Sequence, residues 1–360
     1  MSTRLRSWEV PGILTAAEIA QSGDYLARLQ LPSGQVPWFE GGHCDAWNHV
    51  EAAMALTATG HWDEARAAYQ WLAATQRRDG SWFNYYVGDW VTQRRLDTNV
   101  CAYVATGLWH YLRVTNDHDF ARLLWPTVAR AMDFVLARQR PSGTFTWSLD
   151  ERGASEPYAL LTGSSSIFFS LRAAHALAEA LDIARLDLAV SAGRALHALR
   201  SHPEAFAPKA EFAMDWYYPV LSGAITGDEA SARIAADWDS FVIPGCGVRC
   251  VRPNNWATAA ETSECVLTLD AMGDSDRATA LFASTQRHRQ ADGSYLTGWV
   301  YPQEVTFPTN EATSYTVAAV LLAADALAQG SGGHDLFRHG VLSAVTEMPA
   351  DDCVSPNQAR

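Results

Sequence analysis

The segment that decides the fold is Gln76-Arg-Arg-Asp-Gly80-Ser-Trp82, in which a helical stretch ends and an aromatic loop begins. Glycine just beyond a helix adopts the left-handed cap without a steric penalty, so it marks a helix end. The same ending recurs at irregular spacing, in Gln30–Trp38 around Gly34, in Gln139–Trp147 around Gly143 and in Gln290–Tyr295 around Gly293. Because a solenoid would keep a fixed period, the irregular spacing indicates helical hairpins joined by loops of variable length.

Helical periodicity between these endings predicts an all-α chain. Thr15-Ala-Ala-Glu18 is a capping-box pattern, typical of the first turn of a helix. No sustained alternation indicates a large sheet, although the loops at 81–93 and 294–307 have room for short hairpins. Twelve helices are expected, at about residues 15–30, 44–59, 61–78, 97–115, 117–139, 163–181, 184–202, 214–225, 228–242, 257–273, 275–290 and 311–328.

The connections between the twelve expected helices alternate in length. Those that follow an even-numbered helix are one or two residues long, as at Gly60 and Asn116, whereas those that precede one are mostly long. This alternation predicts six helical hairpins closed in a ring, with the even-numbered helices inside and the odd-numbered helices outside. The ring is expected to be a single domain, residues 1–330, followed by a poorly ordered C-terminal tail, residues 331–360.

Charge and cysteine content exclude several classes of partner. The 360-residue chain carries a formal net charge of −13 without a basic cluster, so neither nucleic acid nor a membrane surface is expected to bind it. The N-terminus lacks a hydrophobic signal core, and the longest apolar runs are too short to span a bilayer. Six cysteines do not make a disulfide framework, so a reduced, cytoplasmic protein is expected. No metal or other cofactor is implied, because His43 and His49 have no obvious third ligand.

In a ring of this topology, the N-termini of the inner helices and the long loops meet at one end. That end would collect carboxylates, amides and aromatic rings, a mixture that suits an oligosaccharide or polysaccharide. The C–H faces of a sugar pack on aromatic rings, while its hydroxyls need amide and carboxylate partners. The expected substrate-binding residues are His43, Trp47, Trp82, Tyr86, Trp90, Asp97, Trp216, Tyr217, Trp256, Tyr301 and Glu311.

Each such residue also has a simpler structural interpretation. Asp45, Asp97 and Glu311 near helix starts fit helix caps, each worth roughly 0.3–2 kcal/mol. His49 fits a hydrogen-bonded core histidine, and Glu264 fits a position that faces an outer helix. The tryptophans would then plug the mouth of the ring. The functional interpretation is favoured because so many of these residues gather at one end.

Two adjacent segments resemble a known class of enzyme. Asp97-Thr-Asn-Val-Cys-Ala-Tyr-Val-Ala-Thr-Gly-Leu-Trp-His-Tyr111, followed by Leu124-Trp-Pro-Thr-Val-Ala-Arg-Ala-Met-Asp-Phe134, looks like the inner and outer helix pair of glucoamylase-like enzymes. The chain resembles the (α/α)6-toroid glycoside hydrolases in architecture over most of residues 15–328, and in sequence over short stretches. It also looks like the actinobacterial hydrolases that cut methylmannose polysaccharides, an α-1,4-linked mannan. That resemblance implies endo-hydrolysis with inversion.

A second resemblance competes with the first. Gln76–Trp82 matches the Gln-Trp repeat of squalene–hopene cyclases and their prenyltransferase-like relatives, which are also α/α toroids. Those cyclases protonate an alkene with the middle Asp of an Asp-x-Asp-Asp motif, which this chain lacks, since Asp351-Asp352 has no preceding Asp. The Asp/Cys/His zinc site of protein prenyltransferases has no convincing counterpart either. The shared repeat is therefore interpreted as a helix ending and its loop.

Inverting hydrolysis needs one carboxylic acid to protonate the leaving oxygen and one carboxylate to activate a water on the opposite face. The two groups lie roughly 6.5–9.5 Å apart, a gap that inner helices on opposite sides of a ring can supply. The expected pair is Asp45 as the base and Glu261 as the acid, whose partial burial beside Trp256 suits that role. Glu311 is the alternative base, and Asp97 is expected to bind hydroxyls where the bond breaks.

Activities from other classes remain as alternatives. A sugar epimerase would use paired histidines as acid and base, and only His43 is well placed for that. A non-catalytic ring that binds carbohydrate or lipid would keep the aromatic residues but would not need two opposed carboxylates. A terpene enzyme predicts a dry cavity lined by aromatic rings with an acidic cluster at its centre, so an open, carboxylate-lined cavity would exclude it.

Overall fold

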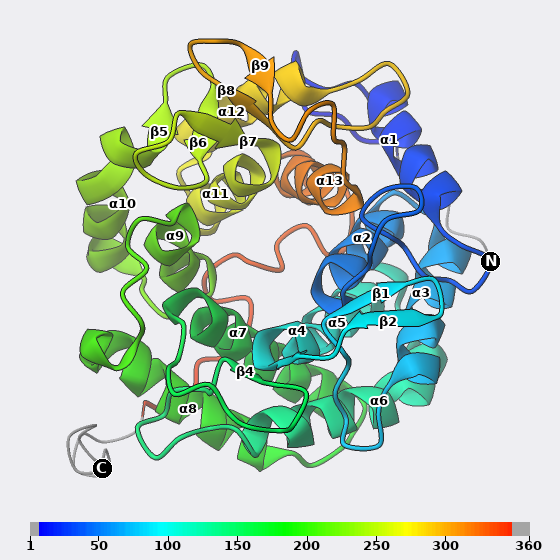
Figure 1. The fold of residues 1–360 in the computed structure, drawn as a ribbon, viewed down its shortest axis with the longest axis vertical. Coiled ribbons are helices and arrows are strands. Elements are labelled where there is room, and N and C mark those ends of the chain that lie inside the picture. Colours follow the sequence, from blue (N-terminus) through cyan, green and yellow to red (C-terminus); the bar gives the residue numbers. More distant parts are fainter. Residues whose placement is uncertain (1–6, 348–360) are drawn as a thin grey trace.

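The computed structural model describes residues 7–347, whose helices form two concentric rings (Figure 1). The inner ring closes because each inner helix packs against the next and the last packs against the first. The inner helices are α2 (Ala46–Ala58), α4 (Thr98–Ala102) with α5 (Val104–Thr115), α7 (Leu161–Ala180), α9 (Ala213–Leu221), α11 (Ala259–Ala271) and α13 (Ser314–Ala328). The outer helices are α1 (Ala16–Leu29), α3 (Trp62–Thr75), α6 (His118–Leu136), α8 (Leu186–Ser201), α10 (Gly227–Phe241) and α12 (Ser275–Thr285).

The predicted ring of six helical hairpins is confirmed, with one interruption. The fourth expected helix, 97–115, is split at Tyr103 into α4 and α5. Inner and outer helices differ in burial as expected for two concentric layers. All positions of α2 except Trp47 and Asn48 are buried, whereas α3 buries only one stripe and leaves its charged side chains toward solvent.

The helix ending at Gly80 joins two neighbouring outer helices. The Gln76 side chain donates hydrogen bonds from Nε2 to the carbonyl of Gly80 and to the carbonyl of Thr127 in α6, both at 2.9 Å. Gly80 has a φ of 90°, and a Cβ built on it would lie 2.0 Å from the carbonyl oxygen of Arg130 in α6. The glycine therefore allows both the left-handed turn and the close approach of this loop to the backbone of α6.

The other three endings repeat this contact around the ring. Gly34 lies against the backbone of α3, Gly143 against that of α8, and Gly293 against that of α1. In the first two, the preceding glutamine again bridges its own loop and the neighbouring outer helix. Because the contact at Gly293 joins the end of the last outer helix to the first, it closes the outer ring.

Gly80→Ala is expected to lower the free energy of unfolding by at least about 2 kcal/mol. An L-residue in the left-handed region costs roughly 1–2 kcal/mol, and the contact with the α6 backbone adds to that cost. Urea unfolding measures the loss. Gly88→Ala is the matched control, because Gly88 has a φ of 52° with nothing within 4 Å of a built Cβ. Equal losses at the two positions would contradict the role of the α6 contact.

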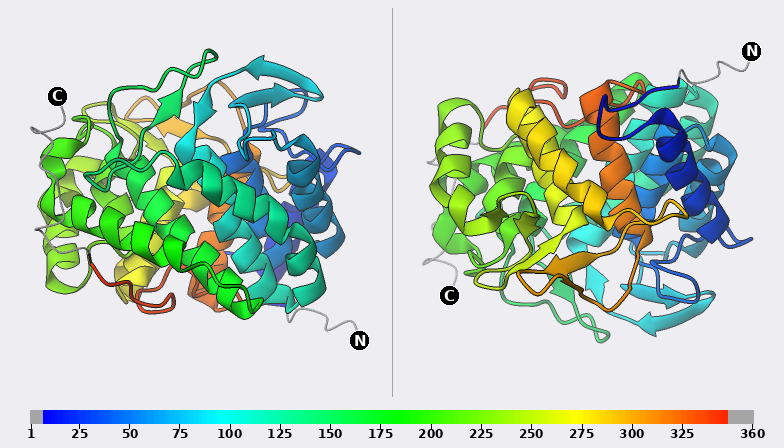
Figure 2. Two further views of the ribbon diagram at one scale, coloured as in Figure 1. Left: turned by 90° about the horizontal axis from the view of Figure 1, so that it is seen from below. Right: turned by 90° about the horizontal axis from the view of Figure 1, so that it is seen from above.

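Short strands gather at one end of the ring (Figure 2). Both predicted hairpins are present: β1 (Tyr85–Val87) pairs with β2 (Trp90–Gln93), and β8 (Gly298–Val300) pairs with β9 (Val305–Thr306). The sequence did not predict that the second hairpin extends an antiparallel five-stranded sheet. Strands of two or three residues are too short to show alternation. The other strands are β3 (Leu96–Asp97), β4 (Ser148–Leu149), β5 (Val242–Ile243), β6 (Gly247–Arg249) and β7 (Trp256–Thr258).

Residues 331–347, the described part of the predicted tail, lie across the opposite end of the ring (Figure 2). Arg338 donates two hydrogen bonds to the carboxylate of Asp270 in α11, at 2.9 and 3.0 Å. Leu336 is buried against the hydrophobic core. This segment therefore covers the far end of the ring. Residues 348–360, the rest of the predicted tail, lie outside the described residues.

Candidate functional site

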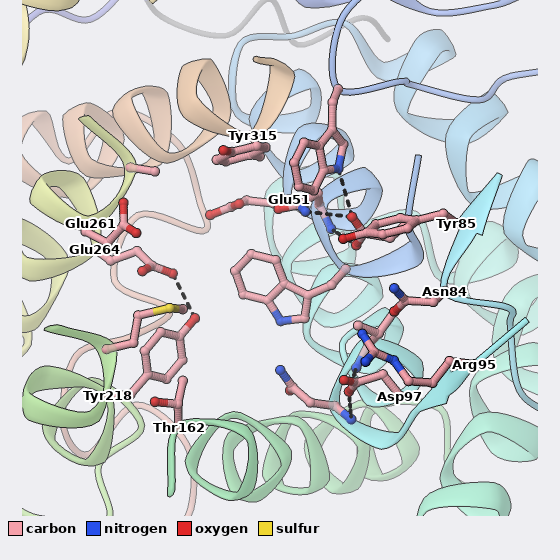
Figure 3. Close-up of a pocket in the computed structure, with 18 residues that line it drawn as sticks. Glu51, Asn84, Tyr85, Arg95, Asp97, Thr162, Tyr218, Glu261, Glu264 and Tyr315 are labelled. Carbon is pink, nitrogen blue, oxygen red and sulfur yellow. Dashed lines mark hydrogen bonds between the residues drawn. The ribbon is translucent and has the colours of Figure 1, made fainter. Parts of the chain in front are cut away.

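A cavity of about 340 Å³ lies at the strand-bearing end, where the inner helices begin (Figure 3). It forms there because the long loops leave room above the first turns of the inner helices. Its walls carry carboxylates, amides and aromatic rings, the mixture predicted for the mouth. The residues that line it are Trp38, Asp45, Trp47, Asn48, Glu51, Asn84, Tyr85, Arg95, Asp97, Asn99, Val100, Thr162, Met214, Tyr218, Ala260, Glu261, Glu264 and Tyr315.

Asp45 is the N-cap of α2 and also lines this cavity. Its Oδ1 accepts a hydrogen bond from the Asn48 backbone N–H at 2.9 Å. Its Oδ2 accepts from Trp38 Nε1 at 2.8 Å and from Asn48 Nδ2 at 2.7 Å. Burial raises the pKa of Asp45, while these hydrogen bonds oppose that rise by stabilising the carboxylate. The capping and functional interpretations are thus compatible, because the cap fixes a carboxylate at the cavity wall.

Glu261 lies in the first turn of α11, and its side chain reaches the same cavity (Figure 3). The Thr258 hydroxyl, at the N-cap of that helix, donates a hydrogen bond to its Oε2. In the inner ring α13 packs between α11 and α2, so Glu261 and Asp45 come from helices that are not neighbours. The two carboxyl groups therefore approach a shared cavity from separate walls.

Two further glutamates, Glu51 and Glu264, lie in the cavity, and neither was among the predicted site residues. Glu264 accepts hydrogen bonds from the hydroxyls of Tyr217 and, at 2.8 Å, Tyr218. Burial raises the pKa of Glu264 to about 7 despite these two donors. Burial, and after it the negative charge of neighbouring carboxylates, that of Glu264 most strongly, raises the pKa of Glu51 well above its ordinary value.

The expectation that Glu264 faces an outer helix is therefore wrong. Residues three or four positions apart lie on the same face of a helix. Glu264 therefore points to the same side of its helix as Glu261, and Glu51 to the same side as Trp47, and all four line the cavity. That spacing was the signal in the sequence. Figure 3 shows the side chains of Glu51, Glu261 and Glu264 directed into the same space.

Two of the predicted binding residues line the cavity and a third lies beside it. Trp47 stacks on Tyr103, with ring centroids 4.4 Å apart. Asp97 caps α4, and burial raises its pKa to about 6. The ring of His43 packs between those of Trp38 and Tyr85, behind the cavity wall. Its centroid lies 4.1 Å from that of Trp38 and 4.5 Å from that of Tyr85.

Four predicted binding residues are packed into the surrounding structure. Trp82 is fully buried and donates from Nε1 to the Leu72 carbonyl at 2.9 Å. Trp216 is buried as well and donates from Nε1 to the Arg233 carbonyl at 3.1 Å. The buried Tyr86 hydroxyl accepts a backbone hydrogen bond within its loop. These side chains anchor loops and helices, and Tyr217 reaches the cavity only through its hydrogen bond to Glu264.

The remaining four predicted residues are not part of the lining of the central cavity. Trp90, at the tip of the β1–β2 hairpin, is 80% exposed. Trp256 donates from Nε1 to the Phe307 carbonyl at 2.8 Å, and Tyr301 lies beneath a guanidinium. Glu311 lines a separate, more open cavity and accepts a hydrogen bond at 3.1 Å from a threonine. The alternative base is therefore outside the central cavity.

The charge of the central cavity disfavours an anionic ligand. Its walls carry five carboxyl groups and one cationic side chain, Arg95. Among residues 7–347 no three His, Cys, Asp or Glu side chains are grouped so that they could hold a metal ion. His49 is a hydrogen-bonded core residue, with Nδ1 accepting from the Val36 N–H at 3.1 Å. A carboxylate-lined cavity of this kind does not fit a terpene enzyme, which needs aromatic, apolar walls.

No helix among the described residues is long and apolar enough to cross a bilayer.

The fold and the site define the class of protein. Solved structures with the same fold include a wild-type glycosidase (TM-score 0.68, 16% identity, 86% of this chain and 96% of that chain). An α-amylase from Clostridium perfringens (TM-score 0.62, 10% identity, 85% and 96%) and a sugar epimerase from a ruminal bacterium (TM-score 0.62, 10% identity, 85% and 98%) also share it. At these identities the likeness shows the fold, an (α/α)6 toroid. No family model matches the sequence.

The family follows from a closer relative. The MMP endo-(1,4)-3-O-methyl-alpha-D-mannosidase of Mycolicibacterium hassiacum is 48% identical over 329 residues, which cover 91% of each chain. The chain belongs to the family of that mannosidase, and it is a glycoside hydrolase. The resemblance stated from the sequence is thereby confirmed.

Proposed function

We propose that this protein hydrolyses internal α-1,4 bonds of a mannan that carries 3-O-methyl groups, and that it inverts the anomeric configuration. The name of the 48% identical relative supports the substrate and the internal cut. The observation that carries the mechanism is the pair of carboxyl groups, Asp45 and Glu261, on separate walls of one cavity. The excess of carboxyl groups over cations argues against an anionic polysaccharide, and an uncharged mannan meets no such repulsion.

In this mechanism Glu261 donates its proton to the glycosidic oxygen as the bond from the anomeric carbon to that oxygen breaks. Asp45 accepts a proton from a water molecule, whose oxygen attacks the anomeric carbon from the opposite face. The product therefore begins as the β-anomer, and both carboxyl groups regain their starting states by exchanging protons with solvent. Oδ2 of Asp45 accepts two hydrogen bonds, whereas Oδ1 accepts one, from the backbone N–H of Asn48. Oδ1 is therefore the oxygen available to the water.

The walls of the cavity supply contacts for a partly methylated sugar. Val100, Met214 and Ala260 contribute apolar atoms for a methyl ether, and Trp47 offers a ring face. The amides Asn48, Asn84 and Asn99 line the same cavity and are suited to hydroxyl groups.

The test is hydrolysis of α-1,4-linked manno-oligosaccharides with and without 3-O-methyl groups. Mass spectrometry should find oligosaccharides from internal cuts of the methylated series, and proton NMR in the first minutes should find the β-anomer of the new reducing end. Release of only terminal monosaccharide would contradict the internal cut. The α-anomer as first product would contradict inversion, and no cleavage of any member would contradict the proposed substrate class.

A further inference from the structure

A second cavity, of about 690 Å³, lies at the same end of the ring but outside the central one. It forms where α1 meets the loops that precede α2 and α13, at the seam where the outer ring closes. A contact crosses the seam beside this outer cavity: Gln21 of α1 donates from Nε2 to the carbonyl of Ala291, which lines the cavity, at 2.6 Å. The residues that matter below are Tyr25, Phe39, Glu40, Asp292, Asn310 and Glu311.

The outer cavity adjoins the central cavity across a thin wall. Trp38 lines the central cavity, while the next residue, Phe39, lines the outer one. In the same way Tyr315, in the first turn of α13, lines the central cavity, and Glu311, four residues earlier in the loop before that helix, lines the outer one. The rings of Trp38 and Tyr315 meet edge to face at 4.9 Å, and the Ser314 N–H donates to the Trp38 carbonyl at 2.6 Å. A chain that leaves the central cavity over this wall arrives in the outer cavity.

The central cavity is too small to hold more than a short piece of a polysaccharide. Its volume of about 340 Å³ is at the lower end of the range of roughly 300–1,000 Å³ found for small-ligand sites. An enzyme that cuts an internal bond holds sugar units on both sides of that bond. Most of a bound polymer must therefore lie outside the central cavity, on the surface around its mouth.

The chemistry of the outer cavity matches that of a neutral sugar chain. Tyr25 and Phe39 offer two half-buried rings, and Glu40 at the edge is exposed. Asn310 and Glu311 add amide and carboxylate oxygens to the lining. Among the described residues the lining holds three carboxyl groups, Glu40, Asp292 and Glu311, and neither Lys nor Arg, while Arg28 lies beside it and donates to the Asp292 carbonyl at 3.3 Å. The excess of carboxyl groups disfavours an anionic polymer.

We propose that the outer cavity is a distal binding site for the polysaccharide whose bond is cut in the central cavity. This inference rests on the proposed function. It takes neutral sugar units several positions from the scissile bond. Sugar faces pack on the rings of Tyr25 and Phe39, and hydroxyls bind the carboxylate of Glu40. The site contributes to affinity for long chains and makes no contact with the reacting atoms.

The test compares long and short substrates in the full-length protein with the double substitution Tyr25→Leu and Glu40→Ala. Leucine keeps apolar bulk on α1 but removes the flat ring, and Glu40 is exposed, so the fold is expected to be retained. For a long methylated α-1,4-mannan, kcat/KM should fall about fivefold or more, through KM. For the shortest oligosaccharide that is cleaved, kcat/KM should stay within about twofold of wild type, because such a chain does not reach the outer cavity.

Glu179→Ala is the matched control, since Glu179 is exposed near the C-terminal end of α7, away from the mouth. It should leave kcat/KM unchanged for both lengths. Equal losses of the double variant on long and short chains, or no loss on either, would overturn the distal site. If the wild type cleaves no member of either series, the proposed function fails instead, so the two failures are distinguishable.

Discussion

Glu261→Gln is expected to lower kcat for a methylated α-1,4-mannan about 10²–10⁴-fold, the usual contribution of a general acid. Glutamine keeps the shape of the side chain and an oxygen that can accept from Thr258, but its amide cannot transfer a proton to the glycosidic oxygen. The expected loss is therefore chemical, with little change in KM. Initial rates of oligosaccharide release measure it, and Glu179→Gln, on an exposed site far from the cavity, is the control.

A substrate whose leaving group needs no proton separates this role from a loss of structure. With an α-mannosyl fluoride, the Glu261→Gln variant should come within about tenfold of wild type, because fluoride leaves without general-acid help. A loss as large with the fluoride as with the polysaccharide would show that Glu261 does not act by donating a proton.

Asp45→Asn is expected to lower kcat by a similar factor, about 10²–10⁴-fold, and also to destabilise the fold. Asparagine can still cap α2 through its oxygen, but its Nδ2 would then face two other donors, Trp38 Nε1 and Asn48 Nδ2. Donors left without an acceptor cost about 1–3 kcal/mol each when buried. Turnover and urea unfolding should therefore both be measured.

The matched control for Asp45 is Asp274→Asn. Asp274 is the N-cap of α12, on the outer ring, where it accepts from the Arg277 backbone N–H at 3.2 Å. Asparagine keeps this cap but loses the ion pair with Arg277, at 2.6 Å, so the substitution should cost at most about 1 kcal/mol and leave kcat nearly unchanged. Added azide should restore bond cleavage in the Asp45→Asn variant and give a β-glycosyl azide, because the anion attacks from the face that the water would use. Near-wild-type turnover of Asp45→Asn, with loss in Glu51→Gln, would move the base to Glu51.

The ring could be predicted because its signals are local and repeat along the chain. The helix endings at Gly34, Gly80, Gly143 and Gly293 and the alternating connections indicate hairpins without any knowledge of distant contacts. The five-stranded sheet could not be predicted, since its strands are two or three residues long and are stabilised by pairing between distant loops.

The candidate site could be predicted only where a helix start fixes the direction of a residue. Asp45, Asp97 and Glu261 lie in or just before the first turns of inner helices, and the structure brings all three to one cavity. Glu51 and Glu264 were missed although helical spacing connects them to predicted residues. The roles of the aromatic residues were harder to predict. The sequence around a loop tryptophan such as Trp82, which is buried, does not distinguish a side chain that packs inward from one that faces a ligand.

The segment 331–347 has a consequence for how a polymer enters and leaves. It lies across the end of the ring opposite the mouth, where Arg338 is tied to α11 and Leu336 to the core. Because residues 331–347 cover that end, we expect a bound sugar strand to enter and leave the central cavity through the mouth. Both strand ends emerge from the same opening, so the fragments produced by each cut depart on the side from which the polymer arrived. This architecture favours dissociation after every cut over processive sliding.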